Sequence, residues 1–528
     1  MVENIYNLSP LDDVGHGTHV AYTAAGSYVN NLEYYGLNMG TVGWMDDKGE
    51  SYFGGVDILA GIDDAIKDGV DVLSASFGGD LIDFSEVDTT SHGIPFVVAR
   101  GNDGPDSYTV SPTSPWIILV AASNEDREIV TPITLANNNT ILGKGIFQGK
   151  EQGFASLITF RNITSAEDIK SLNVEEVKGK VLMLFLQKED DVNPSLKALN
   201  TSGILAFIAA TNPLIGIYDY NQTSGVSIPF VYVDFEQGNQ IFDYFQQCKS
   251  SNIDSKIKIS RSEVLEGQKV ILKVPKFSSR GPSSLTPDIL KPDIAAPGVN
   301  ILAAFPRDNG FIMYSGTSMA APHVSGIIAL LKVAHPTWSP AAIKSALVTT
   351  AWNEDTYGSE IFSEGVGDKI ADPFDFGGGI CNPNGAMDPG LIYDMDNNDY
   401  LNYVCSLGYS NEKVRNASTY FFGTNNSTTR GIICPSKVPS RLDLNLPSIA
   451  IPNLKNSVTI RRTVTNVGDV NSIYKLVVKS PRNSVIKVSP DVLKFDSNTK
   501  KISFEVKIIS TYQRKSKFNF GSLANIML

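Results

Sequence analysis

The stretch YSGTSMAAPHVSG, residues 314–326, places Ser318 at the start of a segment of small and apolar residues. Pro322 stands early in this segment, and the pattern predicts a helix from about 318 to 333. A serine at the start of a helix is usually only a cap. The functional interpretation is that the helix dipole and its free N–H groups stabilise the oxyanion that forms when Ser318 Oγ attacks a carbonyl. The stretch differs from the G-x-S-x-G pattern of lipases and esterases, which argues against that class.

A second stretch offers a base for this serine. GHGTHV, residues 15–20, holds two of the five histidines, and His16 lies between glycines that let backbone and substrate approach closely. A single histidine is more often structural than catalytic. Taken with Ser318, however, His16 completes the pair of base and nucleophile that covalent catalysis needs.

The residues around these two stretches predict an α/β domain. Residues 56–79 are typical of an amphipathic helix followed by a strand. The short apolar runs 94–99 and 116–123 are typical of strands buried on both faces. A further helix is predicted over 339–351, with Ser339 as its N-cap. These elements predict a parallel sheet with helices on both faces.

The composition changes twice along the 528 residues, a length that suits three or four domains. Residues 135–265 hold a second set of apolar strands, with a helix after the last, and predict an inserted domain. The α/β domain is therefore expected to comprise 1–134 and 270–405. Apolar and polar residues then alternate with period 2, which predicts a β-sandwich over 436–528. Its last stretch, 518–528, is not predicted to form a complete strand.

Charge and cysteine content exclude several classes of protein. A net charge of -12 argues against a nucleic-acid partner, which needs clustered Lys and Arg. None of the four cysteines lies in a zinc pattern, and we expect neither a metal nor another cofactor. Three full pairings are open, of which we favour the short loop from Cys405 to Cys434 in an oxidising compartment, with Cys248 unpaired. No uninterrupted apolar run of about 18 residues is present, so we expect no membrane partner.

Evidence on the compartment is divided. The first residues lack the basic start and apolar core of a signal peptide, which alone would indicate a cytosolic protein. N-x-S/T glycosylation sequons give weak support for secretion. These sequons begin at Asn138, Asn162, Asn200, Asn221, Asn416, Asn425 and Asn426.

Six motifs, in chain order, closely resemble those of the subtilisin family of serine endopeptidases. They are GHGTHV, SASFGG, GNDGP, FSSRGP, KPDIAAPGVNILAAF and SGTSMAAPHVSG. The insertion resembles the protease-associated domain of plant subtilases. DLNLPSIAIPNL and RRTVTNVG resemble their C-terminal fibronectin III-like domain, so the resemblance covers essentially the whole chain. It implies a peptide or protein substrate and a secreted glycoprotein of the plant cell wall or apoplast, whereas it leaves the oligomeric state open.

The resemblance also implies roles for single residues. His16 becomes the general base, Ser318 the nucleophile and Asn102 the side-chain donor of the oxyanion hole. By itself, Asn102 would be interpreted as a turn residue. The substrate cleft would be lined by Ser76, Phe77 and Gly78, whose backbone would pair with an extended peptide. All these residues are expected to converge on one cleft.

The family order places the triad aspartate on a strand well before the histidine, and no such strand is found among residues 1–15. Neither Asp12 nor Asp13 is assigned to the triad. We expect the printed chain to be a fragment that cleaves peptides at least about 10³-fold more slowly than a form with the aspartate, because loss of the acid costs about 3 × 10⁴ in subtilisin itself. The alternative is a non-catalytic homologue that binds peptides or proteins. Retention of His16, Asn102 and Ser318 favours the enzyme, and the missing aspartate favours the binding protein.

Overall fold

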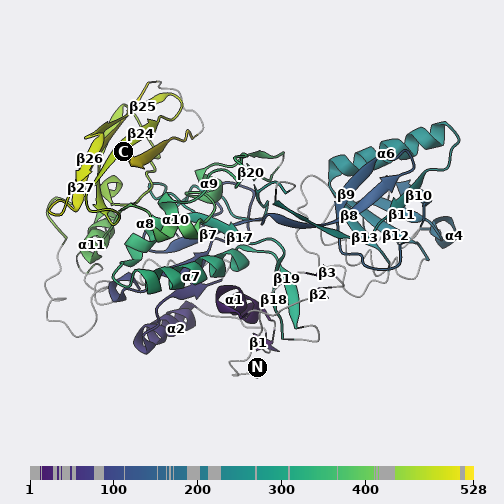
Figure 1. Cartoon of the computed structure of the whole chain (residues 1–528), viewed down its shortest axis with the longest axis horizontal. Helices are drawn as coiled ribbons and strands as arrows, with labels where there is room; N and C mark the ends of the chain where they lie inside the picture. The colour runs from purple at the N-terminus through teal and green to yellow at the C-terminus, as the bar shows by residue number, and fades with distance from the viewer. Residues whose placement is uncertain are drawn as a thin grey trace.

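A computed structural model shows the three parts of the chain along its long axis, with the α/β part in the middle (Figure 1). The structure describes residues 15–27, 55–76, 89–186, 203–211, 228–408 and 434–527, apart from gaps at 112, 152, 162, 164, 166–167, 170–171, 268–269, 307–309, 366 and 512–517. Outside these ranges it describes only 12–13, 33–34, 37–38, 48–49, 411 and 414.

A four-stranded sheet forms the centre of the α/β part. Its strand order is β17-β7-β6-β5, and each neighbouring pair is parallel, which confirms the predicted parallel sheet. The strands are β5 (Leu73–Ala75), β6 (Phe96–Ala99), β7 (Ile118–Ser123) and β17 (Ile294–Pro297). Their side chains are almost all buried, because helices cover the sheet on both sides.

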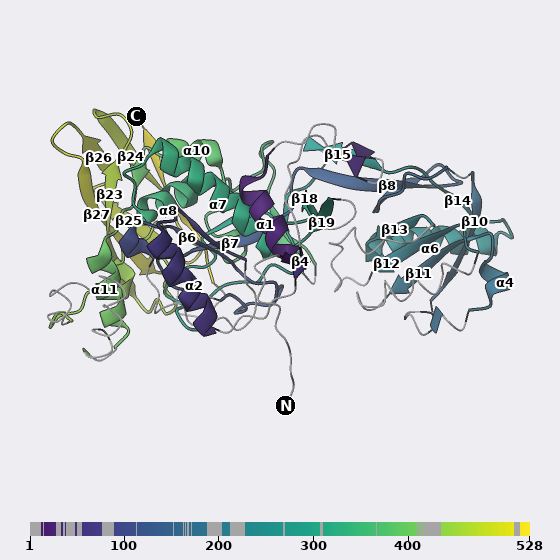
Figure 2. The same cartoon turned by 90° about the horizontal axis from the view of Figure 1, so that it is seen from below.

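Alternate residues of these strands face different helices. Val97 and Ala99 pack in one core with α7 (Thr317–Ala334) and α8 (Pro340–Thr349). Phe96 and Val98 pack in another core with α2 (Gly55–Asp68) and α11 (Asn397–Ser406). Since successive side chains of a strand point to opposite faces, this division follows directly from the strand period of two. Figure 2 shows α2 and α7 as separate layers of this part.

The two long predicted helices of this part are present. Ser339 Oγ accepts a hydrogen bond of 3.0 Å from the N–H of Ala342, so the predicted N-cap of α8 is confirmed. Helix α7 is buried along the face that carries Ala320, Val324 and Ile328. The 18 residues of α7 are also long and apolar enough to cross a membrane, but half of them are buried in the protein, as in the core helix of a soluble protein.

Residues from Arg127 to Glu266 form a second sheet of eight strands, in the order β14-β10-β11-β12-β13-β9-β8-β15, with β14 also paired to β8. The strands are β8 (Arg127–Leu135), β9 (Thr140–Lys144), β10 (Ala155–Phe160), β11 (Val181–Leu186), β12 (Ala206–Thr211), β13 (Phe230–Val233), β14 (Lys256–Ile259) and β15 (Glu263–Glu266). Helix α6 (Phe235–Ser250) packs on it and starts with a capping box of Asp234 and Gln237. The helix was predicted, but its place after the last strand was wrong, because β14 and β15 follow it and join the same sheet. The sheet begins eight residues earlier than the predicted insertion, because β8 and β15 pair along their length.

The C-terminal part consists of two antiparallel sheets, β22-β23-β27-β25 and β26-β24-β28. Their strands are β22 (Leu391–Ile392), β23 (Ser457–Asn466), β24 (Ser472–Lys479), β25 (Ser484–Ser489), β26 (Val492–Phe495), β27 (Lys501–Ser510) and β28 (Ser522–Met527). The expectation of no complete strand over 518–528 was wrong. Strand β28 pairs with β24 through its backbone, although its side chains are mostly exposed and so show no alternating pattern.

Strand β22 joins the sandwich to the α/β part. It pairs with β23, yet it lies well before the predicted start of the sandwich at 436. The side chain of Leu391 packs in the core of the sandwich, and that of the next residue, Ile392, packs in the core beneath α7 and α8. A single strand therefore contributes to two cores.

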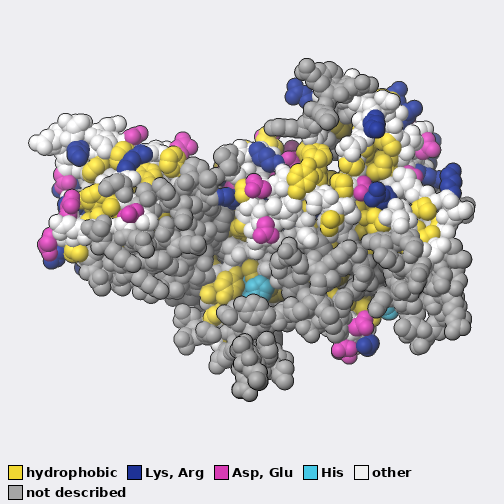
Figure 3. Space-filling view, turned by 180° about the vertical axis from the view of Figure 1, so that it is seen from behind, with side chains coloured by type: hydrophobic (Ala, Val, Ile, Leu, Met, Phe, Trp, Pro, Cys, Tyr) yellow, Lys and Arg dark blue, Asp and Glu magenta, His cyan; other side chains and the backbone are white. Residues whose placement is uncertain are grey.

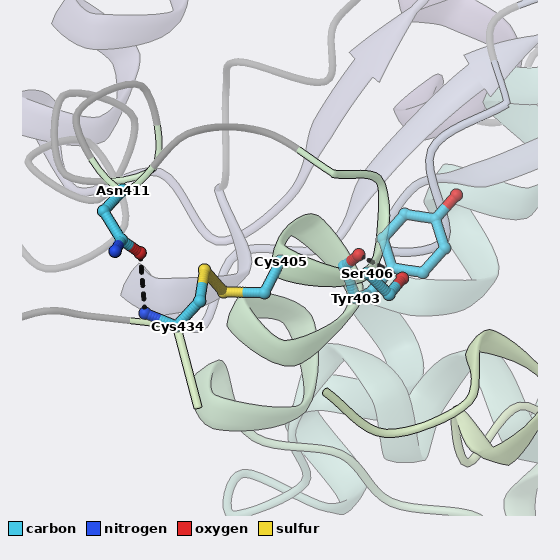
Figure 4. The surroundings of a disulfide bond; sticks show 5 residues. All are labelled: Tyr403, Cys405, Ser406, Asn411 and Cys434. Atoms are coloured by element: carbon cyan, nitrogen blue, oxygen red, sulfur yellow. Dashed lines mark hydrogen bonds between the residues drawn. A yellow bond between two sulfur atoms is a disulfide. The ribbon is translucent and has the colours of Figure 1, made fainter. Parts of the chain in front are cut away.

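The predicted disulfide between Cys405 and Cys434 is confirmed, with Cα atoms 5.6 Å apart (Figure 4). Cys405 lies in α11, and the N–H of Cys434 donates a hydrogen bond of 3.1 Å to the side chain of Asn411. Cys248 is unpaired, as expected, and so is the buried Cys381.

Shorter elements complete the described fold: β1 (Asp12–Asp13), α1 (His16–Ala25), β2 (Glu33–Tyr34), β3 (Leu37–Asn38), β4 (Lys48–Gly49), η2 (Thr90–His92), α4 (Val174–Val177), β16 (Lys273–Val274), β18 (Ile301–Ala304), β19 (Phe311–Tyr314), β20 (Phe362–Ser363), β21 (Lys369–Ile370), α9 (Pro373–Phe376), α10 (Pro383–Met387) and η7 (Arg441–Asp443).

Candidate active site

Ser318 is the second residue of α7 and is partly exposed. The start of α7 comes close to the sheet because Gly298 has no side chain: a Cβ there would lie 2.7 Å from the carbonyl oxygen of Gly316 and 2.9 Å from the Cβ of Ala122. Gly316 in turn donates its N–H to the carbonyl of Gly298 at 2.8 Å. The serine is thus fixed at a helix N-terminus, where unpaired N–H groups and the helix dipole favour negative charge.

Asn102 is held against this helix start. Its Oδ1 accepts hydrogen bonds from the backbone N–H of Thr317 at 3.0 Å and from the Thr317 hydroxyl at 2.9 Å. Because the oxygen is engaged in this way, the Nδ2 group of the same amide is directed elsewhere and is 3.5 Å from the place that a Cβ on Gly316 would occupy. The geometry leaves an amide donor beside the residue that precedes Thr317 and Ser318, as an oxyanion hole requires.

Ser76 makes direct contact with Ser318. The Ser76 hydroxyl donates to the carbonyl of Ser318 at 2.7 Å, and the Ser318 hydroxyl donates to the carbonyl of Ser76 at 3.4 Å. Ser76 directly follows β5, the edge strand of the parallel sheet. Phe77 and Gly78, which were also predicted to line the cleft, lie outside the described residues.

His16 is the first residue of α1, which packs against α7: a Cβ on Gly326 of α7 would lie 2.5 Å from the carbonyl oxygen of Ala24 in α1. The turn before His16 requires glycine, because Gly15 has φ of 83° and a Cβ there would lie 2.2 Å from the ring of Phe305. His16 is partly exposed. Within the part of the chain that the structure describes, no hydrogen bond joins His16 to Ser318.

The carboxylate of Asp12 contacts the backbone at the start of α1, the helix that begins with His16. It accepts hydrogen bonds from the N–H groups of Gly15, at 2.9 Å, and Thr18, at 2.5 Å, and so caps the start of α1. Burial lowers the pKa of His16 below its ordinary value of 6.5, and the negative charge of Asp12 partly offsets this shift. The imidazole is therefore neutral, and able to accept a proton, at neutral pH.

The sequence left three supporting residues unassigned. Asp12 was set aside from the triad, and it lies before Gly15, the N-cap of α1, so an N-cap pattern in the sequence could not have identified its contacts. Thr317 gave no signal, because its partner Asn102 is 215 positions away. His19, the other histidine of GHGTHV, is fully buried, donates from Nε2 to the carbonyl of Ile301 at 2.8 Å, and has its pKa lowered to about 4 by burial. These contacts identify His19 as structural.

Two buried lysines share one carboxylate in the core beneath β7. Lys291 and Lys344 each bond to Asp293 at 2.6 Å, and both also donate to the carbonyl of Ile117 at 3.0 Å. Burial lowers the pKa of Lys291 to about 7, despite the attraction of Asp293. Asp293 also accepts the N–H of Leu119 at 2.8 Å, so this cluster ties β7 to β17. From behind, Figure 3 shows a group of hydrophobic side chains with a histidine beside it.

The chain is similar to several known proteins. The family model described as "Subtilase family" matches residues 4–374, and one described as "Fibronectin type-III domain" matches residues 443–525. The subtilisin-like proteases SBT3.9 and SBT3.10 of Arabidopsis thaliana are each 44% identical to this chain over 99% of its length, and the matches cover 69% and 70% of those proteins. Among solved structures, the psychrophilic subtilisin-like protease Apa1 from Pseudoalteromonas sp. AS-11 has a TM-score of 0.33 and 18% identity, covering 70% of this chain and 83% of that one.

The serine at a helix start, beside a sheet edge and an amide donor, and the protease relatives together define a serine endopeptidase. The chain belongs to the subtilase family, as its motifs predicted. The match at 443–525 confirms the predicted fibronectin III-like part.

Proposed function

We propose that this protein hydrolyses internal peptide bonds, with Ser318 as nucleophile and His16 as general base. The observation that carries the proposal is the attachment of Asn102 to Thr317, which directs an amide donor to the start of the helix that bears Ser318. An oxyanion that forms on the carbonyl attacked by Ser318 Oγ would lie between this amide and the free N–H groups of α7. The neutral state of His16 at neutral pH supports its role as base.

The substrate would bind as an added strand. Among the residues that the structure describes, strand β5 pairs with β6 on one side and has no neighbouring strand on the other. An extended peptide paired with the backbone at Ser76 would bring its scissile carbonyl to Ser318, because these two residues already contact each other. Backbone pairing recognises any sequence, so side-chain pockets would set the cleavage preference.

The other parts of the chain fit a secreted protease. We assign residues 135–265 to a protease-associated domain on their resemblance and on the separate eight-stranded sheet to which they contribute. The disulfide between Cys405 and Cys434 favours an oxidising, extracellular compartment. Asn138, the start of one sequon, is exposed in the turn between β8 and β9, as a glycosylation site requires.

The test is covalent labelling with a fluorophosphonate, followed by peptide mapping, together with turnover of a peptide substrate. We expect one adduct, on Ser318, and loss of both labelling and turnover in Ser318→Ala. Ser325→Ala, which removes a second hydroxyl of α7 that bonds to Ser74 at 2.8 Å, is the matched control and should retain labelling. Labelling elsewhere, or turnover that survives in Ser318→Ala, would refute the assignment of the nucleophile.

One observation favours a second function, a non-catalytic peptide-binding protein. The described side chains of His16 and Ser318 share no hydrogen bond, and the Ser318 hydroxyl donates to Ser76 instead. Such a protein would bind an extended peptide with the same affinity before and after Ser318→Ala, and it would neither label nor cleave. The labelling experiment therefore separates the two functions.

A further inference from the structure

Arg100 has the largest of the fully buried side chains and lies directly between β6 and the loop that carries Asn102. Its exposed fraction is 0%. One terminal nitrogen donates to the carbonyl oxygen of Asp375 at 2.6 Å, and the other donates to the carbonyl oxygen of Ser278 at 3.2 Å. Nε has no hydrogen-bond partner among the described residues. The guanidinium is therefore bonded to two carbonyls and to no carboxylate.

The neighbouring carboxylate is occupied by other cations. Asp375 pairs with Arg280 at 3.2 Å and with Lys369 at 2.7 Å. Arg100 experiences its charge only at longer range, together with repulsion from Arg280, and burial holds the pKa of Arg100 well below its ordinary value. A buried charge without its own counter-ion lowers the stability of the folded state. Stability alone thus gives no reason for an arginine at this position.

Arg100 does, however, donate a hydrogen bond to the segment that holds the loop carrying Asn102. Residues 277–280 hold the loop through three hydrogen bonds, two between backbone groups and one to a side chain. These are Ser279 N–H to Gly101 C=O at 3.1 Å, Gly104 N–H to Phe277 C=O at 2.7 Å and Asp103 N–H to Ser279 Oγ at 3.0 Å. Ser278, whose carbonyl Arg100 holds, lies in the middle of this segment. On the other side of the loop, Gly101 N–H donates to the hydroxyl of Thr317 at 3.2 Å.

We propose that Arg100 is a positioning residue for the loop that carries Asn102. Its buried guanidinium holds the segment 277–280 in place through the carbonyl of Ser278, and this segment sets the position of Asn102 relative to Ser318. This inference rests on the proposed function, and it adds a part of the machinery that makes no contact with substrate. Removal of the guanidinium should loosen the loop and lower the rate of the chemical step. It should leave stability unchanged or higher, because an unneutralised buried charge disappears with it.

The test compares Arg100→Met with Arg462→Met. Arg462 is a matched control, because it is also buried and also bonds only to carbonyls, those of Leu446, Leu442 and Ser448 among them, but it lies in the C-terminal sandwich. Amide hydrogen exchange of Asp103 and Gly104, kcat, KM and the melting temperature are measured for both variants. For Arg100→Met we expect faster exchange at these two amides, a loss of about 10- to 100-fold in kcat at similar KM, and an equal or higher melting temperature. Arg462→Met should change neither the exchange of these amides nor kcat.

Unchanged exchange at Asp103 and Gly104 in Arg100→Met would overturn the inference, whatever the activity. Faster exchange with unchanged kcat would also overturn it, since the loop would then not limit catalysis. If the unaltered protein shows no turnover and no labelling of Ser318, the proposed function fails. In that case the exchange rates alone decide whether Arg100 holds the loop.

Discussion

The side-chain oxygen of Asn102 accepts two hydrogen bonds from Thr317, a residue 215 positions further along the chain. One bond comes from the backbone and the other from the hydroxyl. The pair fixes the rotation of the Asn102 amide, so the proposed oxyanion donor depends on a second residue, Thr317, to which no substrate contact is assigned.

Asn102→Ala and Thr317→Val should therefore reduce kcat in a fixed order. Loss of the donor itself should cost about 10²- to 10³-fold, a range that comes from subtilisin. Thr317→Val keeps the backbone bond and removes the hydroxyl, which donates to Asn102 and accepts from the N–H of Gly101. We expect a loss of about 10- to 30-fold, since the net effect of each lost hydrogen bond is about 1 kcal/mol. Steady-state kinetics on one peptide measures both. A larger loss in Thr317→Val than in Asn102→Ala would contradict this assignment of the donor.

Asp12→Asn should move the acidic limb of the pH–activity profile to lower pH. The base acts when His16 is neutral, and the charge of Asp12 raises the pKa of His16 against the stronger effect of burial. Removal of this charge lowers the pKa of His16 further, so the base stays neutral to lower pH. Asparagine keeps a side-chain oxygen that can accept from the N–H groups at the start of α1, so this helix should persist.

The measurement for this variant is kcat/KM from pH 4 to 8. Asp64→Asn, which removes an exposed carboxylate bonded to Lys67, is the control and should leave the profile in place. A shift of the Asp12→Asn profile to higher pH would mean that the titrating group is not His16.

The free energy of unfolding should rise with pH above about 7 because of Lys291. Burial lowers the pKa of Lys291 from its ordinary 10.5 to about 7 in the folded protein. Between these values the unfolded chain binds more protons than the folded one, so stability increases with pH in this range and is lower at pH 7 and below. Urea denaturation at pH 7, 8 and 9 should show the rise in the unaltered protein and a weaker one in Lys291→Met. Equal slopes for the two proteins would exclude Lys291 as the cause.

Replacement of Cys405 and Cys434 by serine should lower the free energy of unfolding by about 3 to 4 kcal/mol. The disulfide closes a loop with a sequence separation of 29, and the estimate is the chain entropy that such a link removes from the unfolded state. Urea denaturation measures the loss, and reduction of the unaltered protein should reproduce it. A Cys248→Ser variant, in which the disulfide is intact, should show a loss of similar size on reduction. Insensitivity of the unaltered protein to the reductant would contradict the prediction.

Elements with a strong burial pattern could be predicted from the sequence, and elements without one could not. Strand β7 is buried along its whole length and α7 along one face, so their apolar residues revealed them. Strand β28 is held by backbone pairing with β24 while Ile526 and Met527 stay half exposed, and backbone pairing leaves no trace in residue type. Two-residue β22 is too short to show any period.

In the candidate site, too, some residues could be predicted from a sequence pattern, whereas the contacts that orient them could not. The residue types around His16 and Ser318 indicated a base and a nucleophile, whereas the role of Asn102 was implied only by the resemblance of its motif to the subtilisin family. The contacts that orient them, Asp12 on the start of α1 and Thr317 on Asn102, join a side chain to backbone or to a residue far along the chain. Such contacts depend on the folded path of the main chain, which sequence patterns do not specify.

Strand β22 limits how this protein can be divided into interchangeable modules. Leu391 belongs to the core of the sandwich and Ile392 to the core beneath α7 and α8, while the backbone of both pairs with β23. A cut at the predicted boundary near 436 would strip β23 from this strand and leave Leu391 without its core. Exchange of the C-terminal part between relatives therefore has to carry matched residues on both sides of 391–392, so the catalytic and fibronectin III-like parts are constrained to diverge together.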